Sequence, residues 1–193
     1  LPARTGLGSS SSFTVGICNI IRHITKKSCN PDLLAKDAIY IEQNLNKESV
    51  GYQDQILAAY GGLNVINFKE NKFSVSRQNI TDYKKKLLEE SLLLIYTGKT
   101  RVASKIEKKK SKNMRNNYKF LDSVLNCADE FENDLKSRSF DIKKIGEMLD
   151  YTWEKKKLLS KDVSNKKIDD LILYLKKLGI YGAKLIGAGG GGF

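Results

Sequence analysis

The stretch that decides the fold is Pro2-Ala3-Arg4-Thr5-Gly6-Leu7-Gly8-Ser9-Ser10-Ser11-Ser12, which runs directly into an apolar helical pattern. Glycine lets a backbone adopt positive φ and approach an anion closely. A helix N-terminus adds unpaired N–H donors and a favourable dipole, and both suit a phosphate. Serine hydroxyls there can cap the helix, bind phosphate oxygens or coordinate magnesium. The stretch therefore predicts a phosphate-binding loop, with a Gly-Ser linker or an ordinary serine cap as the alternative interpretation.

A second informative segment is Gly51-Tyr52-Gln53-Asp54-Gln55, which is followed by Gly61-Gly62. An acid in a glycine-flanked loop can point into a cleft, where phosphoryl transfer needs a group that orients or deprotonates the attacking hydroxyl. Glu42, on the preceding predicted helix, can be a carboxylate ligand of Mg²⁺, which often takes only one or two carboxylates besides phosphates and water. Taken alone, either acid fits a surface position better, so the segment needs support from the rest of the sequence.

The third segment is Lys184-Leu185-Ile186-Gly187-Ala188-Gly189-Gly190-Gly191-Gly192-Phe193. Its glycines include the G-x-G-x-x-G spacing of a dinucleotide-binding fingerprint after a predicted strand. A glycine-dense turn in which backbone crowds a ligand or another loop explains the same letters equally well. A Walker A loop is excluded elsewhere in the chain, because Leu93 stands where the leading glycine before Gly98-Lys99-Thr100 is required.

In combination and in this order, the three segments closely resemble motifs of the GHMP kinases, a superfamily of small-molecule kinases. Pro2–Ser10 is similar to the second motif of that family, Gly51–Gln55 to its catalytic-aspartate loop and Lys184–Gly192 to its third motif. The resemblance spans nearly the whole chain and implies ATP and Mg²⁺ as cofactors. The first motif of the family, which lies on an N-terminal strand, is not found in this sequence. We therefore expect an incomplete nucleotide and substrate pocket in this chain alone.

The same resemblance implies an α+β fold of the GHMP kinase type in two domains. Residues 1–87 would form a ribosomal-S5-like, ATP-binding N-terminal domain without its first strands. Residues 88–193 would form a ferredoxin-like C-terminal domain without its final strand.

Apolar periodicity and turn residues predict the elements along the chain. The predicted helices are Ser9–Ile24, one that begins at Pro31, one within Gly51–Tyr60, Arg101–Lys110, Lys112–Leu135, Asp141–Leu159 and Lys166–Leu178. The predicted strands are Leu63–Lys69, Lys72–Ser76, Ser91–Thr97 and Ala183–Ile186. We also predict that Lys84–Glu90 is a charged connector.

Carried over residue by residue, the resemblance gives each motif position a role. Asp54 would be the catalytic base that takes the proton of the substrate hydroxyl. Ser10 and Glu42 would hold Mg²⁺. The residues implied to bind the ATP phosphates are Gly6, Leu7, Gly8, Ser9, Ser10 and Ser11. The implied third-motif loop consists of Gly187, Ala188, Gly189 and Gly190. The residues implied to bind substrate are Gln53, Gly61, Lys99 and Arg101.

Several shorter patterns are similar to the branch of the family that contains D-glycero-D-manno-heptose 7-phosphate kinases. These patterns are Glu42-Gln43, Val50–Gln55, Ala58–Gly62, Tyr96–Arg101 and Trp153-x-x-Lys156. The branch implies phosphorylation of the anomeric hydroxyl of a sugar phosphate, which gives a 1,7-bisphosphate for the heptose of lipopolysaccharide core or capsule. Lys99 and Arg101 would then bind the distal phosphate, with surface charges at a helix start as the alternative. Trp153 is expected in the core. A fucose kinase of the same branch is the alternative function.

The composition narrows the class of partner. A formal net charge of +12 favours an anionic partner, which can be nucleic acid, a membrane surface or a phosphorylated metabolite. Lysine far outnumbers arginine, whereas groups that read nucleic-acid bases usually favour arginine. We therefore expect a small-molecule sugar phosphate and ATP as partners, with no nucleic acid and no membrane. A basic nucleic-acid-binding protein with an S5-like fold is the distant alternative, and a homodimer is left open.

The cysteines and the histidine limit which metal sites and catalytic groups the chain can contain. Three cysteines without metal-ligand spacing predict free thiols in the cytoplasm. A single histidine, His23, argues against a serine–histidine triad and against a metal site built from several histidines.

Overall fold

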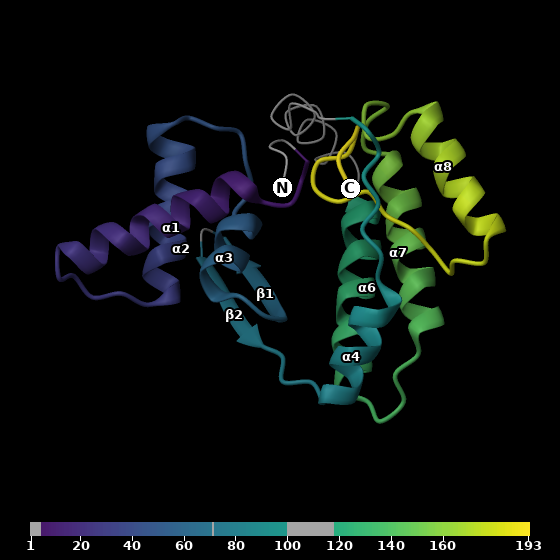
Figure 1. Cartoon of the computed structure of the whole chain (residues 1–193), viewed down its shortest axis with the longest axis horizontal. Coiled ribbons are helices and arrows are strands. Elements are labelled where there is room, and N and C mark those ends of the chain that lie inside the picture. The colour runs from purple at the N-terminus through teal and green to yellow at the C-terminus, as the bar shows by residue number, and fades with distance from the viewer. Residues whose placement is uncertain (1–4, 71, 100–117) are drawn as a thin grey trace. The chain divides into compact units, whose positions relative to one another are not determined.

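The computed structural model describes residues 5–70, 72–99 and 118–193 of the chain (Figure 1). Backbone contacts divide the chain into two compact units. Unit 1 holds Leu7–Asn79, and unit 2 holds Ile80–Phe193 together with Thr5 and Gly6. The predicted domain boundary near residue 88 stays a prediction. Within the described ranges, no helix combines the length and the apolar character needed to cross a membrane.

Unit 1 consists of helices and one hairpin (Figure 1). Its elements are α1 (Ser9–Ile24), α2 (Pro31–Tyr40), the π-helix η1 (Ile41–Leu45), α3 (Gln53–Tyr60), β1 (Asn64–Lys69) and β2 (Lys72–Arg77). The start of α2 follows from its sequence, because the Asn30 side chain accepts a hydrogen bond from the Leu33 N–H at 2.9 Å and proline occupies the first helical turn. The strands pair antiparallel, with Asn64 opposite Arg77.

The apolar stripe of α1 faces outward. The sequence predicts a common face for Phe13, Ile17, Ile20, Ile21 and Ile24, and all five are exposed, from 40% for Ile17 to 73% for Ile24. The buried side of α1 instead carries Val15 and Cys18, which pack against Leu34 and Ala38 of α2. A helix face is buried only where another element covers it, and α2 and α3 cover the Val15 side.

The described part of unit 2 contains four helices, which are labelled in Figure 1. They are α4 (Asp82–Ser91), α6 (Tyr118–Lys136), α7 (Ile142–Lys157) and α8 (Lys166–Lys177). Asp141 and Asn165 accept hydrogen bonds from backbone N–H groups in the first turns of α7 and α8, which explains why both helices begin near their predicted positions.

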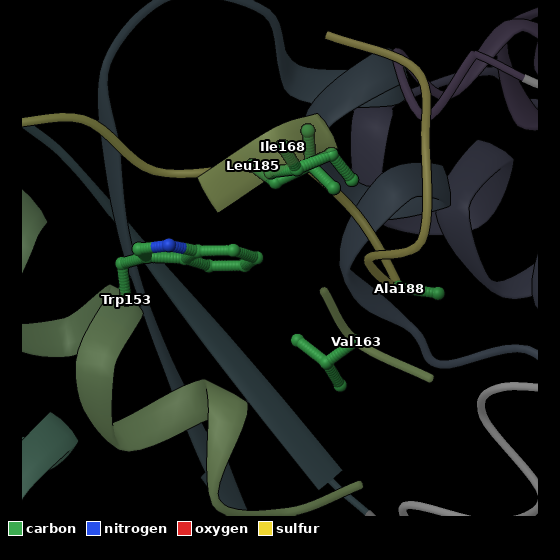
Figure 2. Packing of buried hydrophobic residues seen from close by; sticks show 5 residues of the cluster. All are labelled: Trp153, Val163, Ile168, Leu185 and Ala188. Atoms are coloured by element: carbon green, nitrogen blue, oxygen red, sulfur yellow. The ribbon is translucent and has the colours of Figure 1, made fainter. Parts of the chain in front are cut away.

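The core of unit 2 surrounds the only tryptophan. Trp153 has no exposed surface and packs with Val163, Ile168, Leu185 and Ala188 (Figure 2). The prediction that Trp153 belongs to the core is confirmed.

Three predictions for unit 2 are wrong. The predicted connector Lys84–Glu90 lies inside helix α4, because Thr81 caps the helix N-terminus and the Lys84 side chain is buried. Neither Ser91–Thr97 nor Ala183–Ile186 forms a strand: Ser91 ends α4, and the other residues of both segments carry no regular structure. A strand requires a ladder of paired backbone groups, and these segments make only isolated backbone bonds within the described residues. The predicted helix Arg101–Lys110 lies outside the described residues.

Candidate active site

Two of the predicted segments meet in unit 1, at the start of α1. Gly8 precedes the helix with a φ of 65°, and its carbonyl accepts a hydrogen bond from the Ser12 N–H at 2.9 Å. A Cβ atom built on Gly8 would lie 3.5 Å from the Cβ and Cγ atoms of Asp54. The Asp54 carboxyl group, in the first turn of α3, therefore lies next to the predicted phosphate loop. Gly8, the N-cap residue of α1, has no side chain with which to cap the helix.

Behind this loop, three polar side chains form a buried network. Ser11 Oγ donates to Glu42 Oε2 at 3.0 Å, and Gln55 Nε2 donates to the same oxygen. The network joins α1, η1 and α3, and each of the three residues is at most 4% exposed. Two buried acceptors, Glu42 Oε1 and Gln55 Oε1, receive no hydrogen bond from the described residues. An unsatisfied buried acceptor costs about 1–3 kcal/mol, so this position suits a cation or an ordered water.

Glu42 owes its position to a π-helical turn. The Asn46 N–H donates to the Ile41 carbonyl at 2.8 Å, a bond that spans five residues instead of four. Such turns are rare and often occur at functional sites. The periodicity of the sequence gave no sign of it.

The chemistry of Glu42 fits a magnesium ligand. A carboxylate oxygen without a donor is a suitable ligand atom, and Mg²⁺ takes most of its other ligands from phosphates and water. Within the described ranges, no group of three or more histidine, cysteine or acidic side chains is arranged to hold a metal ion. The structure joins Glu42 to Ser11, while Ser10 is exposed. Shared metal binding by Ser10 and Glu42 stays a prediction.

In unit 2, the third-motif segment is hydrogen-bonded to the beginning of the second motif. The Phe193 N–H donates to the Thr5 carbonyl at 3.2 Å, and the Gly192 N–H donates to the Lys99 carbonyl at 2.8 Å. The Gly192 carbonyl accepts from both the backbone N–H and the hydroxyl of Thr97. A Cβ atom on Gly192 would come within 2.1 Å of the Thr5 oxygen, so only glycine fits there.

The remaining predicted residues lie as follows. Gln53 and Gly61 are exposed at opposite ends of α3, and the Lys99 side chain is exposed in unit 2. Arg101 lies outside the described residues. Gly187 is exposed, whereas Ala188 and Gly189 are buried. The binding roles of these residues stay predictions.

Sequence reasoning gave no role to a lysine that holds the third-motif loop. Lys156 of α7 is 9% exposed, and its Nζ donates to the carbonyls of Leu185, at 3.1 Å, and Gly187. A signal was present, because Lys156 follows the buried Trp153 by three residues and so lies on the core face of its helix.

Comparisons with known proteins agree with these motifs. The profile described as "GHMP kinases N terminal domain" matches residues 1–62, and the profile described as "GHMP kinases C terminal" matches residues 128–193. The chain is 30% identical to the D-glycero-alpha-D-manno-heptose 7-phosphate kinase of Campylobacter jejuni, over 100% of this chain and 57% of that protein. It is 23% identical to a bifunctional fucokinase/GDP-fucose pyrophosphorylase of Arabidopsis thaliana, over 100% of this chain and 19% of that protein. The chain thus spans 57% or less of these two relatives.

Solved structures share the fold. A heptose 1-phosphate kinase of Bacteroides thetaiotaomicron superposes with a TM-score of 0.75 at 24% identity, over 98% of this chain and 52% of that one. The mevalonate kinase of Methanococcus jannaschii superposes with a TM-score of 0.68 at 26% identity, over 100% of this chain and 56% of that one.

Proposed function

Because this chain belongs to the GHMP kinase family, we propose that the protein transfers a phosphate from ATP to the anomeric hydroxyl of D-glycero-D-manno-heptose 7-phosphate. The product is the 1,7-bisphosphate. The observation that carries the kinase proposal is the Asp54 carboxyl group beside Gly8, at the start of α1. The similarity to the Campylobacter jejuni heptose 7-phosphate kinase supports the choice of sugar.

The proposed mechanism assigns binding to backbone groups and proton transfer to one acid. The N–H groups at the start of α1 bind phosphate oxygens through hydrogen bonds and the helix dipole. Asp54 accepts the proton of the anomeric hydroxyl while the sugar oxygen forms its bond to the γ-phosphorus and ADP leaves. An anomeric hydroxyl is more acidic than other sugar hydroxyls, so a carboxylate is a sufficient base. Mg²⁺ held by Glu42 and Ser10 would offset charge on the phosphates.

A fucose kinase is the second candidate, because a plant fucokinase is among the relatives. The two candidates differ in their need for positive charge. Heptose 7-phosphate carries a distal phosphate that Lys99 and Arg101 would bind, whereas fucose is neutral. We also propose that the enzyme works in the cytoplasm and that its product supplies heptose for lipopolysaccharide core or capsule.

The test is ADP release by the complete protein with heptose 7-phosphate, unphosphorylated heptose or fucose as acceptor. We expect turnover with the 7-phosphate alone. Turnover with the neutral sugars would keep the kinase and exclude the heptose phosphate. No turnover with any of the three, from folded protein, would contradict the proposal.

The role of the base is tested with Asp54→Asn. It should keep ATP binding and lose turnover by about 10²–10⁴-fold. The matched control is Asp82→Asn, an exposed aspartate in the first turn of α4 that should behave like the wild type. Full activity of Asp54→Asn would exclude Asp54 as the base.

A further inference from the structure

Lys156 is a buried lysine whose ammonium group is held by the glycine-rich loop. Its Nζ donates to the carbonyl oxygens of Leu185 and Gly187 and lies 5.9 Å from the centre of the Trp153 ring. Lysine is rarely this buried unless it has specific partners, since burial removes the hydration of the charge. A contact with two carbonyls of one short segment suggests a role in shaping that segment.

The two carbonyl contacts fix the orientation of the peptide groups in the loop. A trans peptide is planar, so its C=O and the N–H of the next residue point in opposite directions. Because the Gly187 carbonyl turns toward Lys156, the Ala188 N–H points away from it. Within the described chain, no acceptor receives a hydrogen bond from the backbone N–H of Ala188 or of Gly189.

Gly190, which follows these two residues, is also hydrogen-bonded to the rest of unit 2. The Gly190 N–H donates to the Val163 carbonyl at 2.7 Å. Val163 and Ala188 belong to the same buried cluster as Trp153 (Figure 2). The loop is therefore held before and after Ala188 and Gly189, and their two N–H groups are left as neighbouring donors. Successive backbone N–H groups in a turn can form an anion-binding concavity.

We propose that Lys156 is a positioning residue: it orients the Leu185 and Gly187 carbonyls so that the backbone N–H groups of Ala188 and Gly189 are presented to a phosphate oxygen. The phosphate belongs to the nucleotide or to the sugar, and the proposal rests on the proposed kinase function. Lys156 itself does not contact the phosphate. Its effect passes through the peptide group that it holds.

The test uses the complete protein with three substitutions. Lys156→Met keeps the length and the apolar stem but removes the charge and the donors. Lys156→Arg restores both. The control is Lys176→Met, which removes another lysine of unit 2 whose Nζ contacts Asp150 at 2.7 Å on the surface. The measurements are kcat and KM for ATP and sugar, the thermal unfolding midpoint, and the affinity for a non-hydrolysable ATP analogue from Trp153 fluorescence.

We expect Lys156→Met to remain folded at the assay temperature and to lose about 30–100-fold in kcat/KM, the scale expected when a binding group is misplaced by about 1 Å. Lys156→Arg should recover most of this loss, and Lys176→Met should stay within about twofold of the wild type, as expected for an exposed charge. If the affinity for the analogue falls with Lys156→Met and recovers with Lys156→Arg, the loop binds a phosphate of the nucleotide. A fall in kcat or in sugar affinity alone indicates the sugar phosphate.

The proposal and the kinase function can fail separately. If the wild type binds the analogue but phosphorylates none of the sugars, the analogue affinities of the variants still test Lys156. Two results overturn the proposal. One is a Lys156→Met protein with wild-type kinetics and affinity. The other is a loss of activity that follows only the unfolded fraction, because that is the behaviour of a structural lysine.

Discussion

Replacing Lys84 by methionine tests how unit 2 is held together. Lys84 extends from α4 to the C-terminal end of α6, where its Nζ donates to the carbonyls of Leu135, at 2.6 Å, and Ser137. The side chain is buried, and its ammonium group also lies 5.3 Å from the centre of the Phe140 ring. A cation at this position satisfies carbonyls that a helix leaves unpaired at its end and interacts favourably with the helix dipole.

The expected loss follows from these contacts. Methionine fills similar space but removes the donor to the carbonyl oxygens of buried Leu135 and half-buried Ser137. A buried acceptor left without a donor costs about 1–3 kcal/mol. It also avoids the cost of burying a charge, which offsets part of the loss. We therefore expect Lys84→Met to lower the free energy of unfolding by about 3 kcal/mol. Lys85→Met is the control, because Lys85 is 66% exposed and its Nζ lies 3.9 Å from Glu89, a contact worth about 0.5 kcal/mol or less.

The assay is urea unfolding of the complete protein, followed by Trp153 fluorescence. Trp153 is the only tryptophan and is buried in unit 2, so its signal reports the unit that contains Lys84. Because Lys84→Met loses the contacts of the ammonium group, its urea midpoint should lie well below that of Lys85→Met. Equal midpoints for the two variants would refute the reasoning, because they would mean that the carbonyls at the end of α6 do not depend on Lys84.

Three further predictions concern unit 1. Gly8→Ala should lower the free energy of unfolding by about 1–2 kcal/mol, because Gly8 has a positive φ, and should reduce turnover, because the added Cβ contacts the Asp54 carboxyl group. The control is Gly16→Ala within α1, where a Cβ meets no other atom, so this change should be neutral or stabilising. Thermal unfolding compares the two variants. Ser11→Ala should cost about 1–3 kcal/mol, since it removes a donor to the buried Glu42 carboxylate, and a urea midpoint equal to the wild type would contradict that. In thiol labelling of the native protein, exposed Cys29 should react before Cys18. Burial and nearby Asp37 raise the pKa of the Cys18 thiol, so its reactive thiolate forms only at higher pH, and mass spectrometry of the labelled peptides gives the order.

The candidate site was only partly predictable. Gly8 and Asp54 were singled out from the sequence and its family resemblance, and the structure places them next to each other. The buried network around Glu42 was missed, because it depends on a π-helical turn and on a partner 31 residues away in the chain. The sequence pattern predicts no contact for Lys156, because its partner Leu185 lies 29 residues away in the chain.

The sequence by itself determined several local elements of unit 1. It predicted α1 with its observed ends, the start of α2 at Pro31 and the hairpin of β1 and β2, because caps, turns and periodicity involve residues a few positions apart. Only the tertiary structure decided which face of α1 is buried and that Ser91–Thr97 forms no strand. Burial and strand pairing require a partner surface from elsewhere in the chain, so the same apolar residues can point inward or outward according to what covers them.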